Sequence, residues 1–329
     1  MDLQYVDPDD ADAMAASLAL SAAAHPVDEP WDPPPMPRAH AAFVRNGWDG
    51  EPAKRWLLRD GSGNAIAQLS VDLPERENRH SSGLGVLVHP DKRREGLGRA
   101  VFEEGLARVR ASGRRQVISE THDAPGPNAF AEGLGFTRAS VDVQRRQDLT
   151  AVDNDRVDRL RKEALEAASD YTLLRIVGAV PDGLLDQVVT MTAAINDAPT
   201  DDLDIEDDVF DPQRIRSFET TQELAGNRLY RLVARLGTDG PLAGHTMVGV
   251  PSDLPGWSWQ YDTAVLAAHR GHKLGLLLKA EMMAWLTEAE PDVRWVDTWN
   301  AESNTHMIAV NAALGYEIVT RYVGWQRKL

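Results

Sequence analysis

Two glycines and two arginines stand together at residues 93–98, which read Arg-Arg-Glu-Gly-Leu-Gly. An apolar run precedes them and a stretch with helical spacing of apolar residues follows. Glycines let a backbone approach a ligand closely, and the first N–H groups of a helix have no partner within the helix. Together with arginine, these features predict a cradle for a diphosphate group.

A related hexapeptide, Arg-Gly-His-Lys-Leu-Gly, occupies residues 270–275 and carries Lys273 at the place of the first glycine. A second landmark, Leu-Gly-aromatic, follows both hexapeptides. Gly135 lies 42 residues after the first hexapeptide begins, and Gly315 lies 45 residues after the second begins. Two independent landmarks at nearly equal spacing indicate that one fold is duplicated.

Polar residues interrupt an apolar run ahead of the second hexapeptide, where the sequence reads Gln-Tyr-Asp-Thr at 260–263. The first half has only Ser-Gly-Leu-Gly at the matching place, residues 82–85. Tyr261 and Asp262 are therefore candidates for proton transfer. Strand alternation places them on opposite faces, so we expect at most one to face a cleft. The alternative is that both are polar groups at a strand edge.

An acidic segment at 196–208 carries Asp197, Glu206 and Asp207. Such a run of carboxylates would attract an ammonium substrate. The apolar residues within it favour a docked segment, whereas the alternative is a solvated acidic loop.

Composition limits the function further. The 329 residues are 43% hydrophobic, have a formal net charge of −16 and include no cysteine. The charge argues against nucleic-acid binding, and the absence of cysteine excludes disulfides and thiolate chemistry. No apolar run suits a membrane span, and no secretion signal is visible, so a cytoplasmic protein is expected. His269 and His272 lack a third ligand in register, so no metal site is predicted.

The elements that position these residues recur in the same order in both halves. A strand at 84–88 and a helix at about 100–110 flank the first hexapeptide, and a strand at 257–266 and a helix at 274–288 flank the second. We also expect a proline-rich loop at 25–36 and a hairpin at 136–149. The predicted organisation is an N-terminal domain at 1–150, a linker helix at 151–170 and a C-terminal domain at 171–329.

With these motifs in this order, the chain resembles the GNAT (Gcn5-related N-acetyltransferase) superfamily in a tandem form. The resemblance implies an α/β fold with a mixed, splayed sheet in each of two GNAT domains, and acetyl-coenzyme A in the splay. The family's cofactor contacts transfer to Val86, Leu87, Val88, Arg93, Arg94, Glu95, Gly96, Leu97, Gly98 and Arg99, and to Val265, Leu266, Ala267, Arg270, Gly271, His272, Lys273, Leu274 and Gly275.

The resemblance also bears on catalysis. The family tyrosine that protonates the leaving thiolate falls on Ala131 in the first half and on Asn311 in the second. Asn304 matches the family asparagine that contacts the cofactor's pantetheine, and Asn300, four residues earlier, is a further expected cofactor contact. The second half is thus better equipped, with Tyr261, Asp262 and Asn311 as catalytic candidates.

We therefore expect an acetyl-CoA-dependent N-acetyltransferase whose C-terminal half acts on a small-molecule amine. The acceptor is expected to interact with Asp197, Glu206 and Asp207. One alternative is a non-catalytic acyl-CoA-binding protein, because both family tyrosines are missing. Another is acetylation of a protein amine. We expect no nucleic-acid or membrane partner, and a monomer or homodimer.

Overall fold

A computed structural model describes residues 1–329, and the chain divides into two compact units. Unit 1 comprises residues 1–141, 200–207 and 321–329, and unit 2 comprises 142–199 and 208–320. The predicted domain limits at residues 150 and 171 divide the chain into the two duplicated halves of the sequence. They remain a prediction. The compact units differ from those halves because segments of chain are exchanged between them.

Unit 1 is built on a mixed sheet in the order β1-β2-β3-β4-β5-β12. Only β4 and β5 run parallel. Its strands and helices are β1 (Gln4–Tyr5), α1 (Ala11–Asp28), α2 (Pro37–Asn46), β2 (Lys54–Arg59), β3 (Ala65–Asp72), β4 (Ser81–Val88), α3 (Leu97–Ala111), β5 (Gln116–His122), α4 (Pro125–Gly133) and the end of β12 (Tyr316–Lys328), with a 3₁₀ turn η1 (Pro90–Lys92).

Unit 2 repeats this plan in the order β7-β8-β9-β10-β11-β6, with β10 and β11 parallel. Its elements are β6 (Thr137–Asp148, from Asp142 on), α5 (Asn154–Ala167), β7 (Tyr171–Val177), α6 (Leu185–Thr192), α7 (Pro212–Leu224), β8 (Asn227–Leu236), β9 (Leu242–Pro251), β10 (Trp257–Val265), α8 (Leu274–Ala289), β11 (Trp295–Ala301) and α9 (Thr305–Ala313), with the 3₁₀ turns η2 (Asp182–Leu184), η3 (Ala193–Asp197) and η4 (Ala267–His269). The predicted α/β class with mixed sheets is confirmed.

The last strand of each sequence half completes the sheet of the other unit. β12 pairs antiparallel with β5, from Tyr322 opposite His122 to Lys328 opposite Gln116. β6 pairs in the same way with β11. The hairpin expected at 136–149 is therefore wrong, because residues 137–148 contain no Gly, Pro or Asn to form a turn and extend as one strand.

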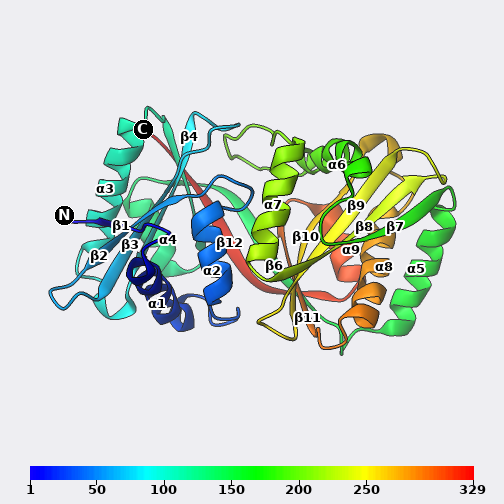
Figure 1. The fold of residues 1–329 in the computed structure, drawn as a ribbon, viewed down its shortest axis with the longest axis horizontal. Coiled ribbons are helices and arrows are strands. Elements are labelled where there is room, and N and C mark those ends of the chain that lie inside the picture. The colour runs from blue at the N-terminus through cyan, green and yellow to red at the C-terminus, as the bar shows by residue number, and fades with distance from the viewer. The chain divides into compact units, whose positions relative to one another are not determined.

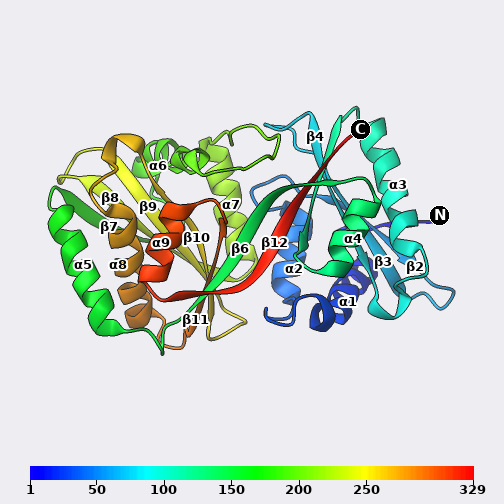
Figure 2. The ribbon, with the colours of Figure 1, turned by 180° about the vertical axis from the view of Figure 1, so that it is seen from behind.

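Helices cover both faces of each sheet. In unit 1, α1 and α2 lie on one face, and α3 and α4 lie on the other (Figures 1 and 2). In unit 2, α6 and α7 lie on one face, and α5, α8 and α9 on the other (Figures 1 and 2). Alternation along β2 illustrates the cause, since Leu57 packs into the α1 core and Leu58 packs against the α3 core.

The loop expected at 25–36 is partly wrong. Helix α1 continues through Pro26 to Asp28, because proline removes only one hydrogen bond so near the end of the helix. Helix α2, which begins at Pro37, was not predicted.

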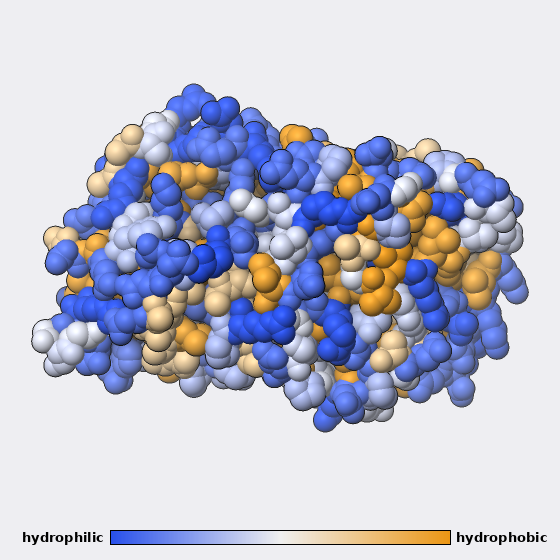
Figure 3. Space-filling view, in the orientation of Figure 1, coloured by the Kyte–Doolittle hydropathy of each residue, from blue (hydrophilic) through white to orange (hydrophobic).

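Hydrophilic residues cover most of the face in Figure 3, as the charge of −16 implies, and hydrophobic ones gather mainly over the region of strands β7 to β9.

Candidate active site

Both hexapeptide loops have left-handed residues at their second and fourth positions. Glycine occupies the fourth position in the first loop and the second position in the second loop. In the first loop Arg94 (φ 68°) and Gly96 (φ 84°) are left-handed, and in the second the left-handed residues are Gly271 (φ 88°) and Lys273 (φ 54°). Gly96 and Lys273 each precede the first residue of a helix, and neither helix start is capped by a side chain. Lys273 therefore preserves the loop conformation, and each helix presents free N–H groups to an anion.

The first arginine of each loop anchors the loop to its own unit. The Arg93 Nε donates to the Val88 carbonyl over 3.0 Å, and its two Nη atoms donate to the Asp28 carboxylate over 2.6 and 2.7 Å. The second loop repeats both contacts, because Arg270 donates to the Val265 carbonyl over 3.1 Å and pairs with Asp197. Asp197, predicted as a substrate ligand, thus occupies the position that Asp28 has in unit 1.

The other charged side chains of the loops are placed nearer to solvent. Arg94 and Glu95 are exposed, and Arg99 donates to the Gly133 carbonyl over 3.0 Å. Lys273 Nζ lies 3.3 Å from the Glu163 carboxylate, and the His272 ring packs at 5.5 Å from the Tyr171 ring. The cations beside the free N–H groups suit the diphosphate of a coenzyme A-type cofactor.

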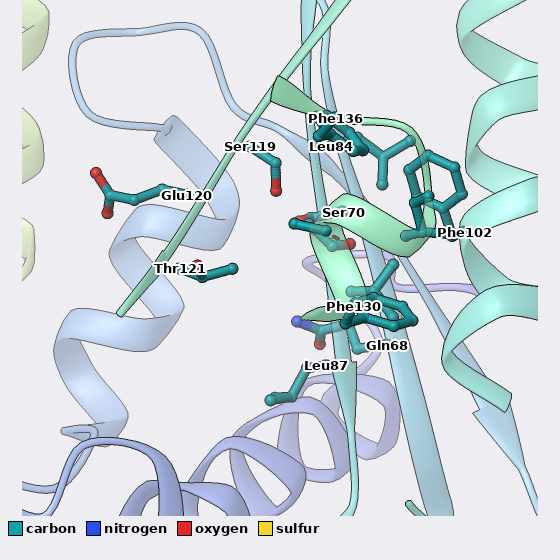
Figure 4. Close-up of a pocket in the computed structure, with 14 residues that line it drawn as sticks. Gln68, Ser70, Leu84, Leu87, Phe102, Ser119, Glu120, Thr121, Phe130 and Phe136 are labelled. Atoms are coloured by element: carbon teal, nitrogen blue, oxygen red, sulfur yellow. Dashed lines mark hydrogen bonds between the residues drawn. The ribbon is translucent and has the colours of Figure 1, made fainter. Parts of the chain in front are cut away.

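A cleft of about 250 Å³ opens in unit 1 where β4 and β5 separate. The two strands pair only from Ser81 to Gly83, so the rest of β4 and β5 diverge. Val86 and Leu87, both predicted cofactor contacts, line the cleft, whereas Val88 does not. Figure 4 shows Ser119 and Thr121 pointing from β5 toward β4, while Glu120 points to the other side of its strand.

The wall of this cleft is mostly apolar and aromatic. Phe102 on α3 and Phe136 meet edge to face with ring centroids 5.7 Å apart, and Phe130 on α4 closes the other end (Figure 4). Ser70 and Gln68 supply neutral polar groups from β3. Shape and lining suit a pantetheine arm, but the lining offers no titratable group that points inward.

Unit 2 differs from unit 1 in how its central strand, β10, pairs with its neighbour. β4 pairs with β3 without interruption, whereas the pairing of β10 with β9 shifts register between Gln260 and Thr263. This bulge adds one residue to β10 and contains Tyr261 and Asp262, so the simple alternation that we expected for these residues is wrong. Bulges re-aim side chains and often lie beside active sites.

Both bulge residues are half-buried. The Tyr261 hydroxyl donates to Gln222 Oε1 over 3.0 Å, and its ring lies over Gly249, where an added Cβ would come within 2.7 Å of the hydroxyl oxygen. Burial raises the pKa of Asp262, and the charge of Arg231 opposes that shift. The Asp262 carboxyl accepts no hydrogen bond from the protein. The Asp262 carboxylate therefore binds a proton more tightly than an exposed aspartate does.

The asparagines predicted in this unit form a local network. Asn311 Nδ2 donates to Asn300 Oδ1 over 2.6 Å, and the fully buried Asn311 Oδ1 has no partner. Asn304 caps α9, since its Oδ1 accepts from the Met307 N–H over 3.1 Å. Asn304 is thus engaged in starting the helix, and Asn311 keeps an unpaired carbonyl oxygen.

Sequence reasoning missed a buried lysine. Lys279, on α8, takes the place that Phe102 has on α3, each being the sixth residue of its helix. Its Nζ lies 4.7 Å from the centroid of the Tyr316 ring, the counterpart of Phe136. Burial lowers the pKa of Lys279 to about 7. The signal was present in the sequence as a single lysine among the apolar residues of 274–286.

The acidic segment divides between the two units. Residues 200–207 belong to unit 1, where Glu206 accepts from the Asn78 N–H over 2.6 Å and donates its own N–H to Asn78 Oδ1 over 2.7 Å. The Asp204 carbonyl accepts from Gln116 over 2.9 Å. Asp207 is exposed. This part of the segment is therefore docked through backbone and side chain.

No three His, Asp or Glu side chains converge as a metal site would require. None of the helices combines the length and apolar character needed to span a bilayer.

Comparison with known proteins places this geometry in a family. No protein-family model matches the chain. The mycothiol acetyltransferase of Stackebrandtia nassauensis is 30% identical over 110 residues, which are 33% of this chain and 35% of that protein. The match thus spans about a third of the relative's length.

Solved structures match over the whole chain. A tandem GNAT protein from the clavulanic acid biosynthesis pathway superposes with a TM-score of 0.82 at 28% identity, covering 99% of this chain and 98% of that one. A GCN5-related N-acetyltransferase from Sphaerobacter thermophilus shares the fold, with a TM-score of 0.65 at 18% identity over 99% and 95% of the two chains. Over its whole length the chain is therefore similar to a tandem protein of the GNAT superfamily and has its fold.

Proposed function

We propose that the chain is an acetyl-CoA-dependent N-acetyltransferase that acts on a primary amine of a small molecule, and that unit 2 carries the reaction. The observation that carries the assignment to unit 2 is the bulge in β10, which has no counterpart in β4. It brings Asp262 and Tyr261 to the point where the parallel strands separate.

The loops and splayed strands fit acetyl-CoA. The free N–H groups at the starts of α3 and α8, together with Arg94 and Lys273, would hold the diphosphate. When bound, acetyl-CoA supplies a thioester, at whose acyl carbon the amine forms a C–N bond while the C–S bond breaks. Asp262 takes the proton that the amine loses, because its raised pKa makes it a stronger base than an exposed aspartate.

The test measures thiol release from acetyl-CoA with a panel of amines. We expect turnover with at least one small amine, and a loss of about 10²- to 10⁴-fold in kcat for Asp262→Asn. Asp72→Asn is the matched control, because burial also raises the pKa of Asp72, which lies in unit 1. Equal loss in both variants, or no turnover with any amine despite cofactor binding, would contradict the proposal.

The cleft in unit 1 favours a separate, binding role for that unit. Its loop has the full glycine pattern and its cleft suits a pantetheine arm, but no inward titratable side chain accompanies them. We propose that unit 1 binds an acyl-CoA without transferring the acyl group. Calorimetry should then count two cofactor equivalents per chain, and one equivalent would contradict this role.

A further inference from the structure

A buried arginine in unit 2 has no carboxylate partner. Arg231, on β8, is 2% exposed, and the hydrogen bond of its Nη1 to His245 Nδ1 over 3.0 Å is its sole bond to the protein. Burial lowers the pKa of Arg231, while the more distant charges of Glu219 and Asp262 oppose the shift. Buried charges in proteins are normally paired, because desolvation is otherwise costly.

The carboxylates nearby do not satisfy this guanidinium. Glu219 Oε1 accepts from the Val180 N–H over 2.8 Å, and its Oε2 pairs with Arg216 over 2.6 Å. Asp262 is not within ion-pair distance of Arg231. The guanidinium therefore keeps donors that the protein does not use.

Two more buried donors lack acceptors on the same side of the sheet. An arginine can only donate, so His245 Nδ1 accepts and the hydrogen of the neutral ring is on Nε2, which is fully buried without a partner. Gln222, on α7, uses its Oε1 to accept from Tyr261 and from Asn227, and its buried Nε2 has no partner. The unused groups of Arg231, His245 and Gln222 are all donors, and they are complementary to a ligand group that only accepts.

The strand register places these donors beside the bulge. Arg231 lies opposite Met247 on β9, and Met247 packs with Tyr261 of β10. Asp262 lies in the same bulge and is affected by the Arg231 charge. Across three neighbouring strands, a cation with spare donors therefore faces a carboxyl group that accepts no hydrogen bond. That arrangement matches a ligand with a carboxylate at one end and an amine at the other.

We propose that unit 2 takes an acceptor of the amino-acid class, whose carboxylate binds Arg231 and His245 Nε2–H while its amine approaches Asp262. The proposal rests on the proposed function and specifies its substrate. Arginine is suited to this role because its planar guanidinium can pair with both oxygens of a carboxylate. The bound carboxylate would supply the acceptor that His245 lacks.

The test compares each amino acid with the amine that remains when its carboxylate is removed: glycine with methylamine, alanine with ethylamine, and lysine with cadaverine. Thiol release is measured for each pair. We expect kcat/KM to be about 10- to 100-fold higher for the acids, mainly through KM. Arg231→Met should abolish this preference, and Arg231→Lys should restore part of it.

Arg55→Met is the matched control. Arg55 occupies the corresponding ladder position on β2 of unit 1 and is half-buried, with its Nη1 buried and unpartnered. Its replacement should leave the preference for acids intact. Melting curves of all three variants identify any that do not fold, and Arg231→Lys, which retains the charge, keeps the test decisive if Arg231→Met unfolds.

Binding of the amino acids without acetyl-CoA, measured by calorimetry, separates the two proposals. Thiol release without a preference for acids, or a preference that is undiminished in Arg231→Met or in Arg231→Lys, overturns the carboxylate site and leaves the acetyltransferase intact. If no amine is turned over, the acetyltransferase proposal fails. In that case amino-acid binding that Arg231→Met removes supports the site, and absence of binding overturns it.

Discussion

The two units share one loop and one sheet order but differ in what surrounds the splayed strands. Unit 1 lines its cleft with Phe102, Phe130 and Phe136. Unit 2 has Lys279 and Tyr316 where unit 1 has Phe102 and Phe136, and it adds the bulge with Asp262. The glycine-containing loop is therefore common to both units, whereas the strand and helix positions behind it decide which ionisable side chains each unit has.

The shared parts have a common physical cause. Each loop uses an arginine to hold the carbonyl of the preceding strand and a carboxylate at the end of an earlier helical segment, Asp28 or Asp197. The loop is thus fixed from within its own unit. The side chains behind the loop take no part in these contacts, so they can differ between the two units while the loop keeps its conformation.

The largest effect is expected from a tryptophan at the second glycine of the loops. Gly275→Trp should abolish thiol release, because an added Cβ there meets no atom within 4 Å and the indole would fill the space at the start of α8. Gly98→Trp should leave thiol release intact but remove cofactor binding in unit 1, since a Cβ there already meets Phe130 at 3.1 Å. Assays of thiol release and calorimetry check both variants.

The same two variants also test whether unit 2 is the catalytic unit. If Gly275→Trp remains fully active and Gly98→Trp is inactive, unit 1 is the catalytic one and the comparison is reversed. Melting curves show whether either loss reflects unfolding.

The next effect concerns the exchanged side chains on α3 and α8. Phe102→Lys should lower the free energy of unfolding by about 4 kcal/mol or more, because it buries an ammonium in an apolar core and removes the contact with Phe136. Denaturant unfolding measures the change. A loss below about 1 kcal/mol would show that this position tolerates charge, as its counterpart in unit 2 does.

The reciprocal variant, Lys279→Met, should stabilise the protein in a pH-dependent way. The pKa of Lys279 falls from 10.5 to about 7 on folding, so between these values the unfolded chain binds more protons and wild-type stability rises with pH. The gain in Lys279→Met should therefore be greatest below pH 7, at about 2–4 kcal/mol after allowing for the contact with the Tyr316 ring, and vanish above about pH 10.5. A gain that does not change with pH would contradict the shifted pKa.

The smallest effect is expected from exchanging lysine and glycine at the left-handed position before each helix, Lys273 or Gly96. Lys273→Gly should raise the free energy of unfolding by about 0.5–1 kcal/mol, because lysine is strained at φ 54° and glycine is not. Gly96→Lys, the reverse exchange in unit 1, should lower it by a similar amount. Denaturant midpoints of both variants check this, and opposite signs would show that the Lys273 contact with Glu163 outweighs the strain.

Short-range features were predictable from the sequence. The glycine pattern, the valine before it and the apolar spacing after it act within about ten residues, so the strand, loop and helix of each half could be located and the duplication inferred. The class of fold and the family followed from the repetition of that order. Tyr261 and Asp262 stood out because polar residues interrupted an apolar strand.

Long-range contacts were decided only by the tertiary structure. The exchange of β6 and β12 depends on pairing between strands distant in the sequence, and each strand has the same pattern whichever sheet it joins. The single-residue bulge in β10 needs the register of β9, and the isolation of Arg231 from any carboxylate needs three strands and α7 to be folded together. The sequence by itself determined that the glycine-containing hexapeptide loop occurs twice, and the folded sheets decided which loop has ionisable side chains beside it, because burial and pairing exist only once the strands have met.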